Sequence, residues 1–457
     1  MVSSLLARGT RVHIMGAGGA GMSGLARLLA GAGVDVSGCD EHASHALSSL
    51  ASDGVRVSVG HDESHVDGID VLTWSPAVSA HNEELLAGRR SSVRMMPRSS
   101  VLAALADARA VIGLTGTHGK TTSTSMMVHV MAAAGRDCAR LLGADVRGVG
   151  ANGAWGDAEL IMEVDESYGS FAELTPYALG LLNVEADHLD HYGSLDALDA
   201  AFGQLIDRTT GPVVAWTDDP GAARVVRGTE RLVVSVGTAD DAQWRVDHAT
   251  TARRRAAFTL RGPKDSIDVV LRVAGLHNVS NAAVVAVLAL SVGVDVAAVQ
   301  RGLAAFEGAP RRFEFRGTWD GVDVYEDYAH LPGEIAATLA ATRAAGYERI
   351  TTVFQPHRVT RTLALATAFA PAFDDAANVV VTDIYDAGEP NPTGVTGQIV
   401  ADAIALRPRS GTTTYCRRLD EVPATLATMR ALSDVIVFVG AGDVATVVET
   451  LPGGVQR

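Results

Sequence analysis

Lysine is almost absent from this chain. Of the 38 basic residues only two, Lys120 and Lys264, are lysines, a bias most simply explained by genome composition. Acidic residues are more numerous, at 53, and the formal net charge is −15 at pH 7. Sequence-independent nucleic-acid binding depends on many phosphate contacts by lysine and arginine, so this charge argues against such a surface. If the ligands are phosphates, a few local cations and helix N-termini must hold them.

Cysteine is scarce, and no apolar run is long. Cys39, Cys138 and Cys416 form no CxxC pair, which suits a reducing cytoplasm, and we expect them to be packing residues. The longest apolar stretch, 281–294, is far shorter than the roughly 20 residues that cross a bilayer. We also find no continuous apolar leader. The sequence therefore predicts a cytoplasmic protein without a membrane span.

The length and the strand pattern predict several α/β domains. A chain of 457 residues exceeds one ordinary core. A strand, glycine turn, helix and strand over 11–40, with short strands to residue 75, predict a Rossmann-like parallel sheet. A second strand, loop and helix begin at 110, and strand-bearing runs at 350–358, 378–389 and 434–443 predict a third, Rossmann-like α/β region. We expect domains at 1–106, 107–310 and 311–457.

A glycine pattern follows the first predicted strand. Gly16, Gly18 and Gly21 form GxGxxG at a helix start, and Asp40 lies nineteen residues after the last glycine. The pattern favours a pyrophosphate at the helix N-terminus, the alternative being a tight turn without a ligand. A nicotinamide or flavin cofactor and a nucleotide-sugar are equally compatible with it.

The stretch GLTGTHGKTT, 113–122, has the residue types of a phosphate loop. Gly116 and Gly119 let backbone N–H groups face oxygens, Lys120 can reach the β- and γ-phosphates, and Thr121 can serve Mg²⁺. The usual spacing fails because position 114 is leucine, so the loop is two residues tighter. A compact ammonium suits such a loop better than the guanidinium that this chain otherwise prefers.

Acidic residues end the next two predicted strands. They are Glu163, Asp165 and Glu166 in MEVDES, and Glu185 and Asp187 in NVEADHLDHYG. Acids beside a phosphate loop suggest Mg²⁺, which takes few carboxylates and many waters and phosphate oxygens. From residue type alone, His188 is expected to be an N-cap or a hydrogen-bond partner, because Mg²⁺ prefers oxygen. Solvated acidic turns are the alternative for Glu185 and Asp187.

Two further groups stand at helix starts. His277, Asn278 and Asn281 precede an alanine-rich helix, and an N-cap explains only one of the two asparagines, so the pair could face a nucleotide. Arg358 and Arg361 are three residues apart, where two guanidinium groups could hold a small carboxylate or phosphate. A solvent-exposed pair is the alternative.

In this combination the motifs resemble the Mur ligase superfamily, ATP-dependent enzymes that join an amino acid or peptide to a UDP-muramoyl carboxylate. The resemblance rests on IMGAGGAGMSG, GTHGKTT, MEVDES, NVEADHLDHYG, GLHNVSNA, APRRFEF, YEDYAHLPGE and FQPHRVTRT, which occur in family order over nearly the whole chain. GAGGAGM, DYAH, FQPHR and DIYDAGE look most like members that add L-alanine to UDP-N-acetylmuramate for peptidoglycan.

The resemblance implies a UDP-substrate domain, a central P-loop ATPase domain and a C-terminal amino-acid domain, with ATP and Mg²⁺ as cofactors. It assigns to the nucleotide Gly116, Thr117, His118, Gly119, Lys120, Thr121, Thr122, His277, Asn278 and Asn281. It assigns to the metal Thr121, Glu163 and His188. It assigns to the substrates Gly16, Gly18, Gly19, Gly21, Asp40, His330, Arg358 and Arg361, the last two at the alanine carboxylate. Its catalytic set is Lys120, Glu163, His188, Arg312 and Asp327.

The sequence departs from the family at one loop, where the usual DDYGHHPTE is EDYAHLPGE, so that Leu331 and Gly333 replace histidine and threonine. Several relatives use a carbamylated lysine, and we expect none here because Lys264 lies in no motif. Three alternatives remain: a ligase that reattaches a recycled peptide, an NAD-dependent oxidoreductase, and a non-catalytic nucleotide-binding relative. The oxidoreductase leaves the series from Lys120 to Arg361 unexplained.

Overall fold

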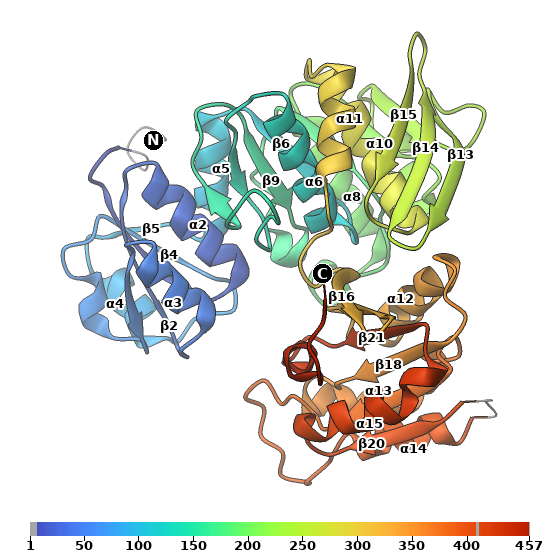
Figure 1. Cartoon of the computed structure of the whole chain (residues 1–457). Coiled ribbons are helices and arrows are strands. Elements are labelled where there is room, and N and C mark those ends of the chain that lie inside the picture. Colours follow the sequence, from blue (N-terminus) through green and yellow to red (C-terminus); the bar gives the residue numbers. More distant parts are fainter. Residues whose placement is uncertain (1–6, 408–410, 457) are drawn as a thin grey trace. The chain divides into compact units, whose positions relative to one another are not determined.

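The computed structural model describes residues 7–407 and 411–456, shown in Figure 1. The chain forms two compact units. The first consists of the residues up to 249 together with 257–271 and 277–306. The second consists of 250–256, 272–276 and the residues from 307 onward. Within the described ranges, every helix is too short or too polar to span a membrane.

A five-stranded parallel sheet begins the first unit, in the order β3-β2-β1-β4-β5. Its strands are β1 (Arg11–Met15), β2 (Asp35–Asp40), β3 (Arg56–Val59), β4 (Val71–Trp74) and β5 (Arg94–Met95). Its helices are α2 (Ala20–Gly31), α3 (His45–Ser52), η1 (Glu63–Val66), α4 (Glu83–Arg90) and α5 (Arg98–Ala108). Successive strand residues face opposite sides. Val12 and Ile14 thus pack in the core with α2, whereas Met15 packs in a second cluster with α4.

A ten-stranded sheet completes the first unit, in the order β15-β14-β13-β12-β11-β10-β6-β9-β7-β8. Its strands are β6 (Val111–Thr115), β7 (Ala139–Leu141), β8 (Gly153–Ala154), β9 (Leu160–Val164), β10 (Ala178–Leu181), β11 (Val213–Trp216), β12 (Val233–Gly237), β13 (Trp244–Ala252), β14 (Arg255–Arg261) and β15 (Ser266–Leu271). Its helices are α6 (Lys120–Ala133), η2 (Ser167–Gly169), α7 (Leu189–Tyr192), α8 (Leu195–Arg208), α9 (Pro220–Arg227), α10 (Leu276–Ser291) and α11 (Val296–Ala305). The central β6 is buried throughout and runs parallel to β9 and β10.

Two glycines bring α2 against β8 in the first unit. A Cβ at Gly153 would lie 1.9 Å from the carbonyl oxygen of Gly24, so a side chain there would collide with backbone. Beside this contact, Asn152 Nδ2 donates to the carbonyl oxygen of Ala20 at 2.7 Å. Arg27 Nη1 donates to Asn152 Oδ1 at 2.6 Å. The first turns of α2 are therefore fastened to the edge of the ten-stranded sheet.

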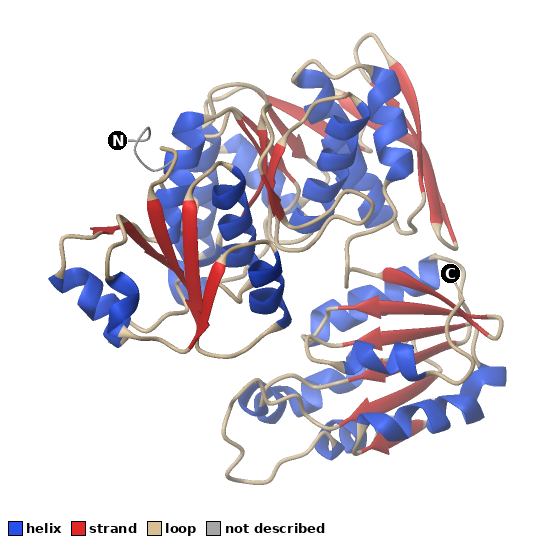
Figure 2. Cartoon of the chain, turned by 60° about the vertical axis from the view of Figure 1, so that its left-hand side comes forward, coloured by secondary structure: helices blue, strands red, loops and turns tan. Residues whose placement is uncertain are grey.

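The second unit contains a six-stranded sheet in the order β16-β17-β21-β18-β19-β20. Its strands are β16 (Glu314–Trp319), β17 (Val322–Asp327), β18 (Ile350–Phe354), β19 (Asn378–Thr382), β20 (Thr413–Cys416) and β21 (Val435–Val439). Its helices are α12 (Pro332–Ala344), α13 (Val359–Ala372), α14 (Gln398–Ala405), η3 (Leu419–Glu421), α15 (Val422–Met429), η4 (Arg430–Leu432) and η5 (Val444–Thr450). Val437 and Phe438 belong to cores on opposite faces, and Figure 2 shows helices covering both.

Candidate active site

The predicted phosphate loop connects β6 to α6, at the carboxyl end of a central parallel strand, where ligands bind in such sheets. Gly119 is the N-cap of α6 with φ of 81°, in the left-handed region that favours glycine. A Cβ at Gly119 would lie 2.7 Å from Asn281 Oδ1. The structure thus brings two predicted nucleotide residues together from α6 and α10.

Lys120 is held inside this loop. Its Nζ donates to the carbonyl oxygens of Gly116 at 2.8 Å and Thr117 at 3.2 Å. It also lies 2.7 Å from the carboxylate of Glu166, and the lysine side chain is only 12% exposed. Burial raises the pKa of Glu166, an effect that the charge of Lys120 opposes. The ammonium therefore has an internal carboxylate as its counter-ion in this structure.

The predicted metal residues fall into two neighbouring groups. Thr121 Oγ1 donates to Glu163 Oε2 at 2.9 Å, and the N–H of Gly143 donates to the same oxygen at 2.9 Å. This hydroxyl and this carboxylate are the oxygen donors that Mg²⁺ prefers. His188 is the N-cap of α7 with φ of 53°, and its Nε2 lies 3.2 Å from Ser167 Oγ. It lies 3.9 Å from Glu166, so it is associated with the lysine–carboxylate pair.

Asn183 shapes the loop from just beyond β10; it is the first residue of the NVEADHLDHYG motif, although the sequence assigned it no role. Its Oδ1 accepts from the N–H of His118 at 2.7 Å, and its Nδ2 donates to the carbonyl oxygen of His118 at 3.1 Å. Thr117 Oγ1 accepts from the N–H of Glu185 at 2.9 Å. Both acid-bearing strand ends thus contact the loop. The signal in the sequence is the place of Asn183 at the head of this motif, after an apolar run.

The remaining nucleotide candidates lie on α6 and α10. Thr122 is in the first turn of α6 and is half-buried. Asn278 is 6% exposed, as is Asn281, whereas His277 is exposed. A capping role does not explain two buried asparagines within the first turns of α10, which favours a shared polar function for them.

The N-terminal glycine turn is held by the acid predicted to accompany it. Asp40 Oδ2 accepts from the N–H of Gly18 at 2.9 Å. The N–H of Gly16 donates to the carbonyl oxygen of Cys39, also at 2.9 Å. Asp40 therefore orders the turn itself in this structure. Gly19 caps α2 without a side-chain hydrogen bond, which leaves the helix N-terminus available to an anion.

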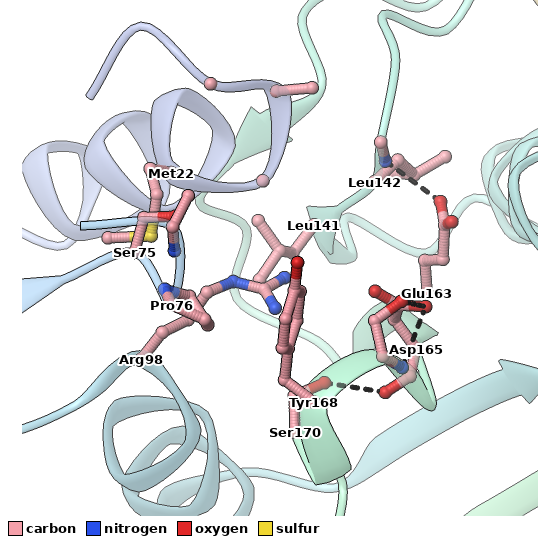
Figure 3. A pocket seen from close by; sticks show the side chains of 16 residues that line it. Met22, Ser75, Pro76, Arg98, Leu141, Leu142, Glu163, Asp165, Tyr168 and Ser170 are labelled. Carbon is pink, nitrogen blue, oxygen red and sulfur yellow. Dashed lines mark hydrogen bonds between the residues drawn. The ribbon is translucent and has the colours of Figure 1, made fainter. Parts of the chain in front are cut away.

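A cleft of about 340 Å³ extends from this glycine turn to Glu163, one of the residues predicted to bind metal. Gly19, Gly21 and Met22 line one part of it, and Glu163 and Asp165 line another. Figure 3 shows Met22 and Arg98 at one end of the cleft and the two carboxylates at the other. Residues that the sequence assigned to two different ligands therefore line one cavity within one unit.

Arg98 and Tyr168 also line this cleft, and the sequence did not indicate either. The buried Nε of Arg98 has no hydrogen-bond partner among the residues that the structure describes. Its Nη2 lies 3.1 Å from where a Cβ of Gly21 would stand. Tyr168 has φ of 54° and is 65% exposed, an unusual backbone state for an aromatic residue. A half-buried cation facing a helix N-terminus suits an anionic substrate group.

In the second unit, Asp327 ends β17 and is 9% exposed. Its carboxylate accepts from the N–H of Phe313 at 2.7 Å and from the N–H of Ala329 at 2.8 Å. Burial raises the pKa of Asp327, while these two hydrogen bonds oppose that effect. The guanidinium of Arg312 lies 5.4 Å from the centroid of the Tyr328 ring.

The predicted amino-acid residues meet around His357. Arg361 Nη1 lies 3.2 Å from His357 Nδ1, and because a guanidinium can only donate, this ring nitrogen accepts. The rings of His330 and His357 are 5.9 Å apart. Burial, then the charge of Arg361, lowers the pKa of His357 to about 4. Arg358 lies 3.7 Å from Glu389 and is 53% exposed, so both guanidinium groups keep donors for an added carboxylate.

The two unusual residues of the EDYAHLPGE loop lie at the start of α12. Leu331 is its N-cap and is 37% exposed. Glu334 supplies the cap, since its Oε2 accepts from the N–H groups of His330 at 2.8 Å and Leu331 at 3.0 Å. A Cβ at Gly333 would meet no heavy atom within 4 Å. The substitutions therefore leave the helix start intact and open space beside it.

Three family models match the chain in succession. The Mur ligase family catalytic domain matches residues 11–110, the Mur ligase middle domain matches 114–289, and the Mur ligase glutamate ligase domain matches 311–442. The first and second matches contain the glycine turn and the phosphate loop, and the third contains Asp327 and both arginines.

Curated relatives and solved structures agree with these matches. A UDP-N-acetylmuramate–L-alanine ligase of Kineococcus radiotolerans is 43% identical, with 97% of this chain and 95% of that protein covered. One of Thermobifida fusca is 40% identical, with 95% and 94% covered. The crystal structure of a UDP-N-acetylmuramate-alanine ligase from Thermotoga maritima has a TM-score of 0.81 and 28% identity, covering 96% of this chain and 97% of its own. A murein peptide ligase from Psychrobacter arcticus, at 22% identity and a TM-score of 0.67, shares the fold. With relatives this similar along nearly its whole length, the chain belongs to the Mur ligase family.

Proposed function

We propose that this chain is an ATP-dependent ligase that adds L-alanine to the lactyl carboxylate of UDP-N-acetylmuramate. The observation that carries the proposal is the shared cleft, in which the N-terminal glycine turn and the Glu163 group line one cavity. The reaction must bring a nucleotide-linked carboxylate to the γ-phosphate of ATP, and this cleft joins the sites proposed for the two. The curated relatives that carry this name cover 97% and 95% of the chain.

The chain's own residues have separate tasks in this proposal. Lys120 exchanges Glu166 for the ATP phosphates, and the N–H groups of the surrounding loop face the same oxygens. Thr121 and Glu163 would hold Mg²⁺, and the ion would supply neutralisation of the phosphate charge. Arg312 and Asp327 assist at the ATP, as the family resemblance implies. We keep the domains expected from the sequence: residues 1–106 bind the UDP-substrate, 107–310 bind ATP and 311–457 bind the amino acid.

The lactyl carboxylate, positioned by the glycine turn and Arg98, attacks the γ-phosphate and displaces ADP to give an acyl phosphate. The amine of L-alanine then attacks the acyl carbon, and inorganic phosphate leaves through a tetrahedral intermediate. Arg358 and Arg361 hold the alanine carboxylate so that its amine is free to react. Positioning and charge neutralisation account for most of the catalysis of phosphoryl transfer, in keeping with the residue types of this site. Because the reaction consumes ATP, we place it in the cytoplasm.

A second acceptor is worth testing because of Gly333. Glycine at this position lacks the threonine side chain of the family pattern, and the space around it is open. A larger acceptor, such as a recycled tripeptide, could use that space. The recycling ligase therefore remains the second candidate.

The test measures phosphate release with ATP, Mg²⁺ and UDP-N-acetylmuramate, adding L-alanine, glycine, L-serine or the tripeptide in parallel. We expect release that depends on L-alanine, with the mass of the amide product as confirmation. Release with the tripeptide alone would move the chain to the recycling branch. If an enzyme that binds ATP releases no phosphate with any of the four acceptors, both candidates are contradicted.

A further inference from the structure

Three histidines, a cysteine and a glutamate converge on the face of the five-stranded sheet that α4 and η1 cover. His13 lies on β1, Cys39 on β2, His65 in η1 and Glu84 in α4, while His61 follows β3. His13 and Met15 point to the same face of β1, and Met15 is in register with Cys39 on β2. The fold therefore gathers side chains from five separate segments, and none of these five side chains lines the proposed active-site cleft.

Their polar atoms are close together. His13 Nε2 lies 2.9 Å from Glu84 Oε1, and His65 Nδ1 lies 3.2 Å from Glu84 Oε2. Cys39 Sγ lies 3.2 Å from Glu84 Oε2 and 3.4 Å from His13 Nε2. His61 Nδ1 is 3.1 Å from Glu84 Oε2 and 3.3 Å from Cys39 Sγ.

The cluster is buried in an apolar surrounding. Cys39 and Glu84 are 0% exposed and His13 is 3% exposed. Met15, Leu72 and Leu85 pack in the same cluster as Cys39. For the part of the chain that the structure describes, every ion pair of Glu84 is with one of the three histidines. A carboxylate this deep requires compensation by charge as well as by hydrogen bonds.

We propose that His13, Cys39, His65 and Glu84 bind one Zn²⁺ ion. Imidazole nitrogen, thiolate sulfur and carboxylate oxygen are the zinc ligands of proteins, and four of them make a closed structural site. The four ligand atoms all lie within 4.8 Å of one another. A tetrahedral ion with ligands about 2.1–2.3 Å away keeps them roughly 3.4–3.8 Å apart, so small side-chain shifts are sufficient.

Charge balance supports a divalent ion here. Two neutral imidazoles, one thiolate and one carboxylate carry two negative charges, so Zn²⁺ makes the buried group neutral overall. Zinc binding breaks the Cys39 S–H bond, its proton leaves to solvent, and the sulfur keeps the electron pair that forms the Zn–S bond. The sulfur ligand argues for zinc over Mg²⁺ or Ca²⁺, which prefer oxygen.

The surrounding residues orient the ligands as at known metal sites. His13 Nδ1 lies 2.8 Å from Ser37 Oγ, so the nitrogen opposite the ligating one has its own partner. Asn82 caps α4 by accepting from the N–H of Glu84 at 3.0 Å, which fixes the glutamate at the start of that helix. His61 remains as a hydrogen-bond partner for the two anionic ligands.

The site is structural, and it adjoins the glycine turn. The carbonyl oxygen of Cys39 accepts from the N–H groups of Gly16 and Ala17, both at 2.9 Å. Zinc held by the Cys39 side chain would fasten η1 and α4 to the strand that supports this turn. Its loss is therefore expected to lower the melting temperature of the protein. The inference stands whether or not the proposed ligase activity is correct, because it concerns metal content.

The test loads the full-length protein with Zn²⁺ in excess Mg²⁺, removes unbound metal by gel filtration and measures zinc by mass spectrometry. We expect one zinc per chain in the wild type and loss of it in Cys39→Ser and Glu84→Gln. Cys138→Ser is the matched control, because the half-buried Cys138 thiol also points at a carboxylate, that of Glu159 at 3.5 Å. Equal zinc in Cys39→Ser and the wild type would overturn the proposal.

A second measurement needs no variant and so does not depend on the folding of one. Co²⁺ bound by the wild-type protein should give the near-ultraviolet thiolate-to-cobalt charge-transfer band and the strong visible bands of tetrahedral cobalt. A strong chelator should remove these bands and lower the melting temperature. Failure of the protein to take up cobalt, or uptake without a thiolate band, means that the residues form only a hydrogen-bonded network and the proposal is wrong.

Discussion

The ammonium of Lys120 lies 2.7 Å from the carboxylate of Glu166, and both side chains are largely buried. The ammonium also donates to the backbone carbonyl oxygens of Gly116 and Thr117, and Asp165 Oδ1 lies 3.6 Å away. Hydrogen bonds from one nitrogen to three different residues require a compact donor that can point in three directions. This geometry gives a structural reason for a lysine in a chain that otherwise uses arginine.

Lys120→Arg should reduce phosphate release by roughly 100-fold or more, because a planar guanidinium cannot reproduce these bonds or reach the phosphates in the same way. Lys264→Arg is the control, since Lys264 is exposed and lies in no motif. Near-normal turnover of Lys120→Arg would refute the role given to this residue.

Gly119→Ala should disturb the phosphate loop in two ways. A side chain is strained at φ of 81°, and its Cβ would stand 2.7 Å from Asn281 Oδ1. Gly135→Ala separates the two effects, because Gly135 has φ of 70° but no heavy atom near its Cβ position. We expect both variants to lose about 1 kcal/mol of stability from strain, and only Gly119→Ala to raise the KM for ATP. Equal KM values for ATP in the two variants would exclude the Asn281 contact as a determinant.

Arg98→Ala should raise the KM for UDP-N-acetylmuramate by roughly 10- to 100-fold, the value of a charge-assisted hydrogen bond, with little change in the KM for L-alanine. Arg90→Ala is the control, because Arg90 at the end of α4 forms an exposed ion pair with Glu63 of η1. A uniform loss of turnover with unchanged KM values would instead assign Arg98 a structural role.

Arg361→Ala should raise the KM for L-alanine much more than the KM for ATP, since the proposed contact is to the alanine carboxylate. Arg407→Ala, which removes a surface ion pair with Asp374 in the same unit, should change neither. Steady-state kinetics with each substrate varied in turn distinguish these outcomes. Equal increases in the KM for L-alanine and the KM for ATP would show that Arg361 does not bind the alanine carboxylate.

Stability should fall in mild acid because of His357. Burial depresses its pKa to about 4 in the folded chain, below the ordinary value of 6.5. The unfolded chain therefore binds the proton first, so the stabilisation is complete above pH 6.5 and is lost as the pH falls toward 4. The loss is on the order of 1–3 kcal/mol. Melting temperatures of wild type and His357→Gln at pH 7 and pH 4.5 should converge at the lower pH, and a constant difference would contradict this assignment.

Local patterns were sufficient to predict much of the fold. Glycines and apolar strands bracket the βαβ unit over 11–40 and the strand and helix around Lys120, and the structure has both. The strands β13, β14 and β15 were not predicted. Arg253, Arg254 and Arg255 interrupt the pattern between the first two of them, and buried and exposed residues alternate along β15. Half-exposed strands of this kind depend on their neighbours in the sheet more than on their own sequence.

In the candidate site, too, local sequence predicts some residues and misses others. Gly119, Lys120 and Thr121 could be named because their chemistry depends on residues next to them in the chain. His188 was expected to be an N-cap or a hydrogen-bond partner from its residue type, and it occupies an N-cap position beside Ser167. Arg98 could not be found, because its environment is created by strands far away in the sequence.

Cys39 was expected to be a packing residue, and it is indeed buried. Its polar neighbours come from segments up to 45 residues away, with no metal-binding spacing between them. Only the register of β1 against β2 and the packing of α4 on the sheet bring these groups together.

The contact between Gly24 and Gly153 has a consequence for the speed of the reaction. It packs the backbone of α2 directly on β8, so the turn proposed to hold one reactant and the sheet proposed to hold the other touch within one compact unit. Reactants that are held in this way behave as if at effective concentrations of up to about 10⁵–10⁸ M, because the entropy of their encounter has already been lost on binding. A methyl group at position 153 would collide with the carbonyl oxygen of Gly24, loosen this contact and slow the encounter.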